Sequence, residues 1–126
     1  MKKIIKTKEA PLPIGPYNQA ILKNDTLYAS GQIALDPNTN KLVIGDIKTE
    51  TKQVMENLVA VLNAADMDFS QVVKCSIFIS DMNDFAAINE VYGSYFDHET
   101  APARETVQVA VLPKNVNVEI SLIAVR

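Results

Sequence analysis

The chain has 126 residues, of which 48% are hydrophobic and 21% charged, and its formal net charge at pH 7 is −3. These values are typical of one globular domain, so we expect a single domain spanning residues 1–126. The acidic balance argues against a nucleic-acid partner. A single cysteine, Cys75, allows no intramolecular disulfide, and together with a single histidine, His98, it offers too few ligands for a zinc site. The lack of a long apolar run argues against a membrane segment. We therefore expect a cytoplasmic protein with no metal or cofactor. We also expect a site at a subunit boundary, because a deep pocket would remove much of so small a core.

The first third of the chain is predicted to form extended segments separated by turns. Residues 1–6 are locally basic and predict a solvated terminal strand, and residues 17–22 predict a second strand. Residues 11–16 contain three prolines and a glycine, which mark a loop. Residues 27–33 alternate, with one face made of Leu27, Ala29, Gly31 and Ile33 and the other of Tyr28, Ser30 and Gln32.

Two segments show the helical period. Asp46 is a suitable N-cap for the first, and Asp81 lies a few residues upstream of the second. We interpret both apolar stripes as faces packed on the core and not as cofactor sites. The first stripe is Ile47, Val54, Leu58, Val61, Leu62 and Ala65, and the second is Phe85, Ile88, Tyr92, Tyr95 and Phe96.

Three further segments alternate as strands do, and their apolar faces should point toward the helices. Cys75 lies on one of these faces, which predicts an inert buried thiol. The resulting order of elements favours an α+β domain, a mixed sheet with two helices packed on one face. The three apolar faces are Val73, Cys75, Ile77 and Ile79; Val107, Val109 and Val111; and Val118, Ile120, Leu122 and Ala124.

The second face of this sheet mixes charged, small polar and apolar side chains. A fully solvated face would seldom hold Ile123 and Val125 together, whereas a mixed face suits association with other copies of the chain. We therefore predict a homo-oligomer that packs through this face. Its predicted members are Arg104, Thr106, Gln108 and Ala110 on one strand and Asn117, Glu119, Ser121, Ile123 and Val125 on the last.

The most chemically capable pair on this predicted face is Arg104 and Glu119. If their strands pair antiparallel across the turn at Pro113, the two side chains and Thr106 share one face. A guanidinium and a carboxylate could then converge on a small ligand. The alternative is a structural ion pair, which spacing alone leaves equally open and which would contribute little stability, about 0–1 kcal/mol.

Other polar residues are weaker candidates. Ser30 and Gln32 should reach the same face by alternation, and Tyr17 is either a site residue or a packing residue with a solvated hydroxyl. No histidine lies on this face, so a Ser-His-Asp arrangement is unsupported. His98 follows Asp97 in a predicted loop, where we expect a surface role.

From end to end the chain resembles the RidA (YjgF) family. Several motifs occur in the family's order, which makes the resemblance specific. They are Ile14-Gly15-Pro16-Tyr17, Tyr28-Ala29-Ser30-Gly31-Gln32-Ile33, Gln53-Val54-Met55-Glu56-Asn57-Leu58, Lys74 with Phe78-Ile79, Asp81-Met82-Asn83-Asp84-Phe85, Asn89-Glu90-Val91-Tyr92, Pro102-Ala103-Arg104, and Leu112-Pro113-Lys114 with Val118-Glu119-Ile120.

The resemblance implies a chorismate-mutase-like fold and a homotrimer with sites in clefts between subunits. It also implies a hydrolase, a 2-iminobutanoate/2-iminopropanoate deaminase that converts 2-imino acids to 2-keto acids and ammonia and so removes reactive imines. In this sequence, the family's catalytic positions fall on Arg104, Glu119 and Tyr17. Its substrate-binding positions fall on Ser30, Gly31, Asn89 and Thr106.

The segment after Arg104 departs from the family pattern. Many deaminating members have Ser-Cys there, whereas this chain has Glu105 and Thr106. By alternation Glu105 should point away from Arg104, toward the helices or an edge; if it turned toward Arg104, it would compete with a substrate carboxylate.

The alternative function is a non-catalytic trimer that binds a small carboxylate or acts as a regulator. A ribonuclease activity has also been attached to such proteins, but the acidic charge and the lack of a histidine pair disfavour it.

Overall fold

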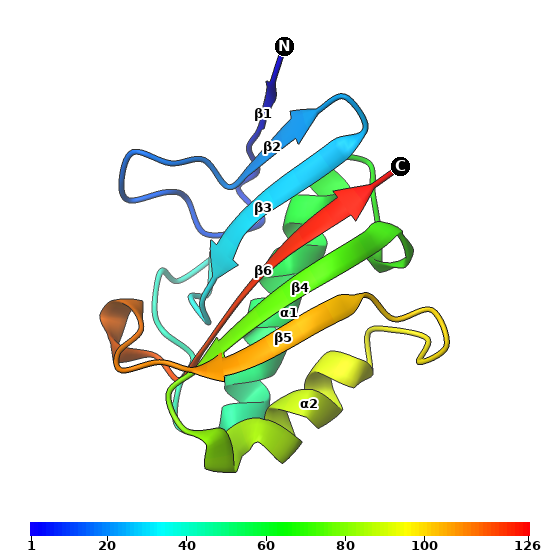
Figure 1. Cartoon of the computed structure of the whole chain (residues 1–126). Coiled ribbons are helices and arrows are strands. Elements are labelled where there is room, and N and C mark those ends of the chain that lie inside the picture. The colour runs from blue at the N-terminus through cyan, green and yellow to red at the C-terminus, as the bar shows by residue number, and fades with distance from the viewer.

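The computed structural model describes all 126 residues, Met1–Arg126, as a six-stranded sheet with two helices packed on one face (Figure 1). This confirms the predicted α+β class and the predicted order of elements along the chain. The strands are β1 (Lys3–Ile5), β2 (Ala20–Lys23), β3 (Thr26–Gln32), β4 (Val72–Ile79), β5 (Ala103–Gln108) and β6 (Val118–Val125), and the helices are α1 (Ile47–Ala64) and α2 (Phe85–Gly93).

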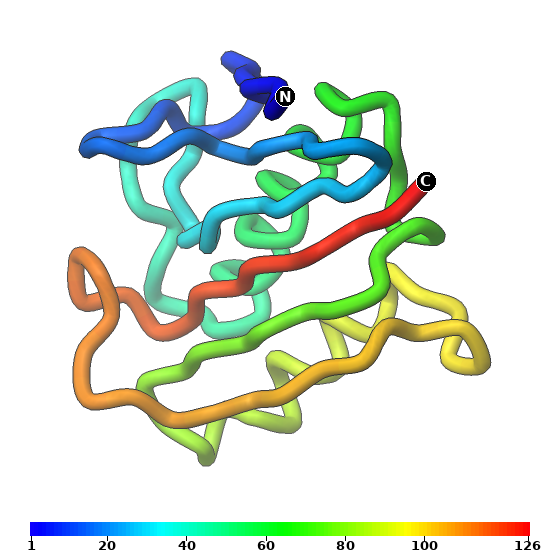
Figure 2. The backbone as a smooth tube through the Cα atoms, turned by 45° about the horizontal axis from the view of Figure 1, so that its top comes forward, coloured from blue at the N-terminus to red at the C-terminus, as the bar shows by residue number.

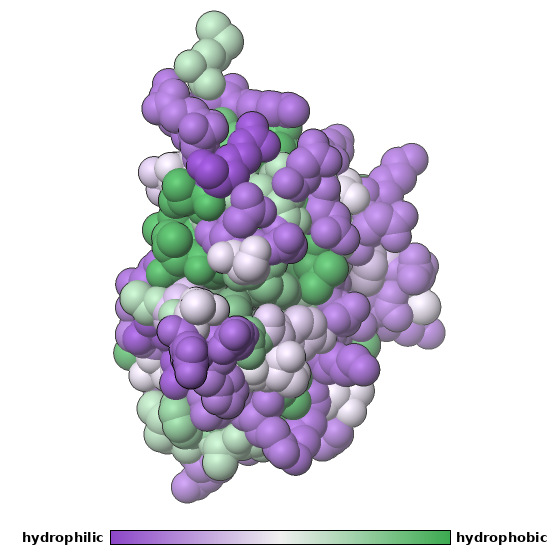
Figure 3. Space-filling model, turned by 90° about the vertical axis from the view of Figure 1, so that its right-hand side faces the viewer, coloured by the Kyte–Doolittle hydropathy of each residue, from purple (hydrophilic) through white to green (hydrophobic).

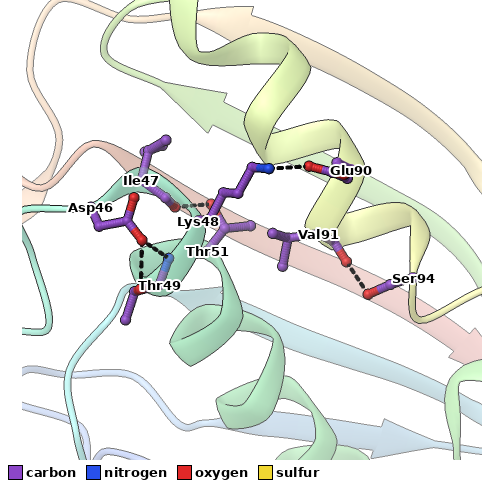
Figure 4. A network of polar contacts seen from close by, with 8 residues as sticks. All are labelled: Asp46, Ile47, Lys48, Thr49, Thr51, Glu90, Val91 and Ser94. Carbon is purple, nitrogen blue, oxygen red and sulfur yellow. Dashed lines mark hydrogen bonds and ion pairs between the residues drawn. The ribbon is translucent and has the colours of Figure 1, made fainter.

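Helix α1 begins where the capping residue predicts. The Asp46 carboxylate accepts hydrogen bonds from the Thr49 backbone N–H (3.2 Å) and the Thr49 hydroxyl (2.6 Å), which satisfies one free donor of the first turn. In the same turn, Lys48 forms an ion pair with Glu90 of α2 (Figure 4). These contacts fix the start of α1 and connect it to α2. Asp81 caps a short 3-10 turn, Met82–Asp84, that leads directly into α2.

The core lies between α1 and the sheet. The predicted helical stripe is buried at Val54, Leu58, Val61 and Leu62, which are 0–1% exposed. Cys75 is also fully buried, and burial raises the pKa of its thiol. These observations confirm a core-facing helix and place Cys75 in the position that alternation predicts.

The strand order is β1-β2-β3-β6-β4-β5, and every neighbouring pair is antiparallel except β4 and β5, which are parallel (Figure 2). Strand β6 therefore lies between β3 and β4, while β5 is an edge strand joined to β4 through α2. The predicted hairpin between the strands of Arg104 and Glu119 is wrong. The segment that contains Pro113 instead carries the chain past β4 from one of its neighbours to the other.

The pairing with β4 also reverses the predicted faces of β5. Arg104 pairs with Cys75 and Thr106 with Ile77, and both partners are buried under the helices. Gln108 follows the same face, and its side-chain oxygen accepts a hydrogen bond from the Met82 backbone N–H in the turn before α2. Arg104, Thr106 and Gln108 therefore point toward the helix layer. Val107 points the other way and is 39% exposed.

Two bulges explain the other departures from strict alternation. In β3, Ala29 and Gln32 pair with Leu122 and Ile120, so Ser30 and Gly31 together oppose one residue of β6. The extra residue turns Gln32 into the core, where it is 6% exposed, and corrects its predicted place beside Ser30. A register shift between Val72 and Lys74 likewise turns Val73 out of the core, away from the face of Cys75.

The sheet face away from the helices is partly apolar. Ile4, Tyr28, Val107 and Val125 lie there with 39–50% of their surface exposed. A side view also shows hydrophobic groups in separate patches between hydrophilic ones (Figure 3). None of the helices combines enough length and apolar character to cross a membrane.

Candidate active site

The first group of predicted site residues surrounds Arg104 on the helix side of β5. The Arg104 guanidinium donates a 2.6 Å hydrogen bond to the side-chain oxygen of Asn89 on α2. It faces a pocket of about 630 Å³ whose wall includes Tyr92, Pro102 and His98. His98, which we expected to have only a surface role, thus also borders this pocket. We call this pocket the arginine half-site.

The second group surrounds Glu119 on the opposite face of the sheet. Tyr17, Ser30, Gly31 and Glu119 line one pocket of about 430 Å³, together with Lys114. The Glu119 side chain forms no ion pair in the chain, and burial raises its pKa above the ordinary value of 4.5. A carboxylate with a raised pKa is a stronger base than an exposed one. We call this pocket the glutamate half-site.

The loop that places Tyr17 is held by a buried glutamine. The Gln19 side chain is 1% exposed, accepts from the Thr7 backbone N–H (2.7 Å) and donates to the carbonyl oxygens of Thr7, Ala10 and Pro11 (2.8–3.2 Å). Buried amides bonded in this way fix a loop firmly, because each lost contact would leave an unpaired polar group. Sequence periodicity gave no sign of this role.

The bulge in β3 shapes the glutamate half-site. The Ser30 hydroxyl donates to the Asn18 carbonyl oxygen (2.6 Å) and so joins β3 to the segment after Tyr17. At Gly31, an added Cβ would lie 2.8 Å from Glu119 Cδ and 3.0 Å from Glu119 Cγ. The Glu119 side chain therefore occupies the space that any larger residue at position 31 would need.

Arg104 and Glu119 do not meet within one chain. Arg104 faces the helices, whereas Glu119 pairs with Phe78 and faces away from them. The two pockets share no lining residue. The predicted common face is therefore wrong for the single chain, and so is the alternative of an ion pair between these two residues. The cause is β4, which lies between their strands.

Glu105 points away from Arg104, as alternation predicts, but toward the sheet face opposite the helices and not toward the helices, because Arg104 and Thr106 occupy the helix side of β5. Its carboxylate pairs with Lys74 at 2.7 Å, and hydrogen bonding to Lys74 lowers its pKa. Glu105 thus stays ionised and does not compete for Arg104. The departure from the family pattern at this position leaves the Arg104 guanidinium free of an acidic partner.

Thr106 has a buried hydroxyl without a hydrogen-bond partner in the chain. Removing an unpaired buried hydroxyl while keeping its shape is nearly neutral or stabilising. We expect Thr106→Val to keep or raise the free energy of unfolding, by up to about 1 kcal/mol, in urea denaturation. A loss of more than about 1 kcal/mol would instead show that the hydroxyl makes a stabilising bond in the native protein.

Comparisons with known proteins agree on one family. The model described as Endoribonuclease L-PSP matches residues 7–126. A RutC family protein of Synechocystis sp. is 55% identical over 124 residues, covering 98% of this chain and 95% of that protein. A protein of Mus musculus named 2-iminobutanoate/2-iminopropanoate deaminase is 47% identical over 126 residues, covering 100% and 93%.

A solved structure supports the same grouping. The crystal structure of E. coli TdcF with bound serine matches with a TM-score of 0.92 and 44% identity, covering 98% of each chain. The family model and these relatives each cover almost the whole chain, so the relationship holds for the entire domain. The chain belongs to the Endoribonuclease L-PSP family, the RidA/YjgF/RutC group that its motifs indicate.

Proposed function

We propose that this protein is a hydrolytic deaminase that converts 2-imino acids such as 2-iminobutanoate and 2-iminopropanoate to 2-keto acids and ammonia. The observation that carries the proposal is the chemistry of the two half-sites. One offers a guanidinium with no acidic partner, and the other an unpaired carboxylate with a raised pKa. The full-length relationship to the mouse deaminase supports the same reaction.

We further propose that the protein is a homotrimer and that each site forms between two subunits. Arg104 and Glu119 lie on opposite faces of one sheet, so a single chain cannot present both to one small substrate. The exposed apolar side chains on the sheet face of Glu119, Val107 among them, favour contact with another copy. In a cyclic trimer, the arginine half-site of one subunit would face the glutamate half-site of the next.

The substrate has a planar carboxylate next to an electrophilic C=N bond. The planar fork of Arg104 can hold this carboxylate through two parallel hydrogen bonds, which a lysine cannot do. Asn89 holds the guanidinium from the other side. Tyr17 would close the pocket over the substrate, while Ser30 and Gly31 would supply hydrogen bonds or space around it. Thr106, whose hydroxyl is buried and lines neither pocket, would act only through its place on the same face of β5 as Arg104.

Hydrolysis then needs one positioned base. Glu119 would orient a water molecule and accept its proton as the water oxygen bonds to the imine carbon. The proton would next pass from Glu119 to the amino nitrogen of the tetrahedral intermediate. As the hydroxyl proton of the intermediate moves through Glu119 to the leaving nitrogen, the C–N bond breaks, ammonia leaves, the carbonyl of the 2-keto acid forms and the carboxylate of Glu119 is regenerated.

The family's description names an endoribonuclease, which is a different class of function. A net charge of −3 gives little attraction for a polyanion, because neutralisation of phosphates supplies most nucleic-acid affinity. RNA therefore serves as a control substrate. We expect no RNA cleavage that depends on Arg104.

The assay generates 2-iminobutanoate in situ with an amino-acid oxidase and traps it with semicarbazide. We expect the purified protein to lower the yield of trapped imine and to raise that of 2-oxobutanoate. No effect of the pure protein on either yield would refute the proposed function.

Gly31 offers a test that leaves both charged residues in place. In Gly31→Ala, the added methyl collides with the Glu119 side chain and must displace its carboxyl group. We expect a loss of deaminase activity on the order of 10²-fold, the lower range for misplacing a general base. The free energy of unfolding should change little, because a flexible side chain can swing aside. Equal activity of the variant and the wild type would contradict the placement of Glu119 at the reacting water.

A further inference from the structure

Helix α2 presents a stripe of three side chains to Arg104. Phe85, Asn89 and Tyr92 follow the i, i+4, i+7 spacing and therefore lie on one face of the helix. The Arg104 Cζ atom lies 5.1 Å from the centre of the Tyr92 ring and 5.7 Å from that of the Phe85 ring. Both distances are within the range of cation–π attraction.

This environment holds the guanidinium without neutralising its charge. The acidic residues next to the stripe and next to Arg104 in sequence, Glu90 and Glu105, are paired with Lys48 and Lys74. Arg104 itself forms no ion pair in the chain. Two aromatic faces and one amide oxygen thus fix its position and leave its charge available to an incoming anion.

Tyr92 stays neutral in this arrangement. Tyr92 is 5% exposed, and burial, together with the neighbouring Cys75 thiol, raises the pKa of its hydroxyl far above the usual value for tyrosine. The neighbouring Cys75 thiol also has a pKa raised by burial. A tyrosinate or thiolate here would pair with Arg104 and compete with a carboxylate ligand.

Arg104 needs such support because of its location. It lies on β5, an edge strand with a neighbour on one side only, and its own side chain is exposed. A free arginine side chain carries about 2 kcal/mol of rotamer entropy, part of which must be lost when both fork donors meet one carboxylate. Side chains that restrict the guanidinium before binding lower that cost.

We propose that Phe85 and Tyr92 are positioning residues that hold the Arg104 guanidinium in the orientation in which it receives the substrate carboxylate. The proposal rests on the proposed function for the identity of the ligand and extends it to two residues that do not touch the reacting atoms. It predicts that loss of either ring weakens carboxylate binding while the fold and the charge of Arg104 remain.

The test measures the dissociation constant of 2-oxobutanoate by calorimetry on the assembled protein. We expect Tyr92→Leu and Phe85→Leu each to weaken binding by about two- to fivefold, the loss of one cation–π contact to an exposed guanidinium. Tyr92→Phe keeps the ring and should bind as the wild type does. Phe85 is only partly buried, so Phe85→Leu remains informative if Tyr92→Leu fails to fold.

Phe69→Leu is the matched control. Phe69 packs against the rings of Tyr95 and Phe96 in the same aromatic cluster, but Arg104 stacks on neither of these nor on Phe69. This variant should lose a similar core contact and keep the affinity of the wild type. Weakening by Phe69→Leu equal to that of Tyr92→Leu would overturn the proposal, because it would show a general effect of core packing.

A spectroscopic readout reports the position of Arg104 directly. The chain has only two arginines, Arg104 and Arg126, so the Nε–Hε signals of their side chains can be assigned by Arg104→Lys. The Arg104 signal should carry a ring-current shift that Tyr92→Leu reduces and Phe69→Leu preserves. An unchanged signal in Tyr92→Leu would overturn the proposal.

The two proposals fail in different ways. If the wild-type protein hydrolyses the imine while all variants bind 2-oxobutanoate equally, the inference about Phe85 and Tyr92 is wrong and the proposed function stands. If the affinities change as expected but no imine is hydrolysed, the proposed reaction is wrong and the positioning role stands. If the wild type binds no 2-oxobutanoate, the positioning role is wrong as well.

Discussion

Arg104→Ala should lower kcat/KM for 2-iminobutanoate by about 10²- to 10³-fold. The reason is the loss of a bidentate, charge-assisted contact with the substrate carboxylate, for which truncation of one partner typically costs about 2–5 kcal/mol. Arg104 is exposed and forms no ion pair, so the free energy of unfolding should change little. Trapped-imine kinetics and urea denaturation measure the two quantities separately.

Arg104→Lys separates the effect of the positive charge from that of the planar, two-donor guanidinium group. Lysine keeps the positive charge but offers a single point donor, so it should recover only a small part of the lost activity. Full activity in the lysine variant would show that charge alone suffices and would refute a bidentate role for Arg104.

Glu119→Gln should lower kcat by about 10²- to 10⁴-fold, the usual contribution of a general base. The stability of this variant should not fall. Burial raises the pKa of Glu119 in the folded protein, so the ionised carboxylate is disfavoured there. The protonated carboxyl group therefore stabilises the fold at low pH, and this stabilisation is lost as the pH rises through the raised pKa. A neutral amide of the same shape avoids this cost at pH 7. A folded variant with wild-type activity would contradict the assigned role, and a variant that unfolds would contradict the expected stability.

The pH profile tests the same residue without a mutation. The base must be ionised to accept a proton, so activity should fall as the pH drops through the Glu119 pKa. Because burial raises that pKa, the acid limb of kcat/KM should have its midpoint above the 4.5 of an ordinary glutamate. The measurement is semicarbazide trapping between pH 4 and 8, with enough oxidase at each pH that formation of the imine is not limiting. A midpoint at or below 4.5 would contradict the assignment of Glu119 as the base.

The helices and most of the core could be predicted from the sequence because local rules determine them. Asp46 caps α1 as its side-chain chemistry predicts, and the apolar stripe that includes Leu58 is buried. Period-two alternation likewise found the buried face of β6, where Ile120 is fully buried. These features depend on neighbours within a few residues.

Strand pairing could not be predicted in the same way, because it depends on contacts far apart in sequence. The valines at 107, 109 and 111 looked like a core face, yet Val107 points away from the helices. The helix side of β5 instead carries Arg104, because α2 supplies it with aromatic and amide partners rather than with aliphatic ones.

The candidate site shows the same division. Family motifs identified Tyr17, Gly31 and Glu119, and these three line one pocket. The residues that hold site groups in place were missed, because neither Gln19 nor Tyr92 carries a signal that separates it from an ordinary buried residue. A buried amide and a buried ring acquire such roles only from the three-dimensional contacts around them.

Mixed trimers test most directly whether the site joins two subunits. Arg104→Ala and Glu119→Gln chains are co-expressed with different affinity tags, and trimers that contain both are purified through the two tags in turn. If Arg104 of one subunit works with Glu119 of the next, each mixed trimer of cyclic symmetry has one intact site in three and should show about one third of wild-type activity. If the mixed trimers are no more active than the two single variants, the site does not combine Arg104 and Glu119 from different subunits.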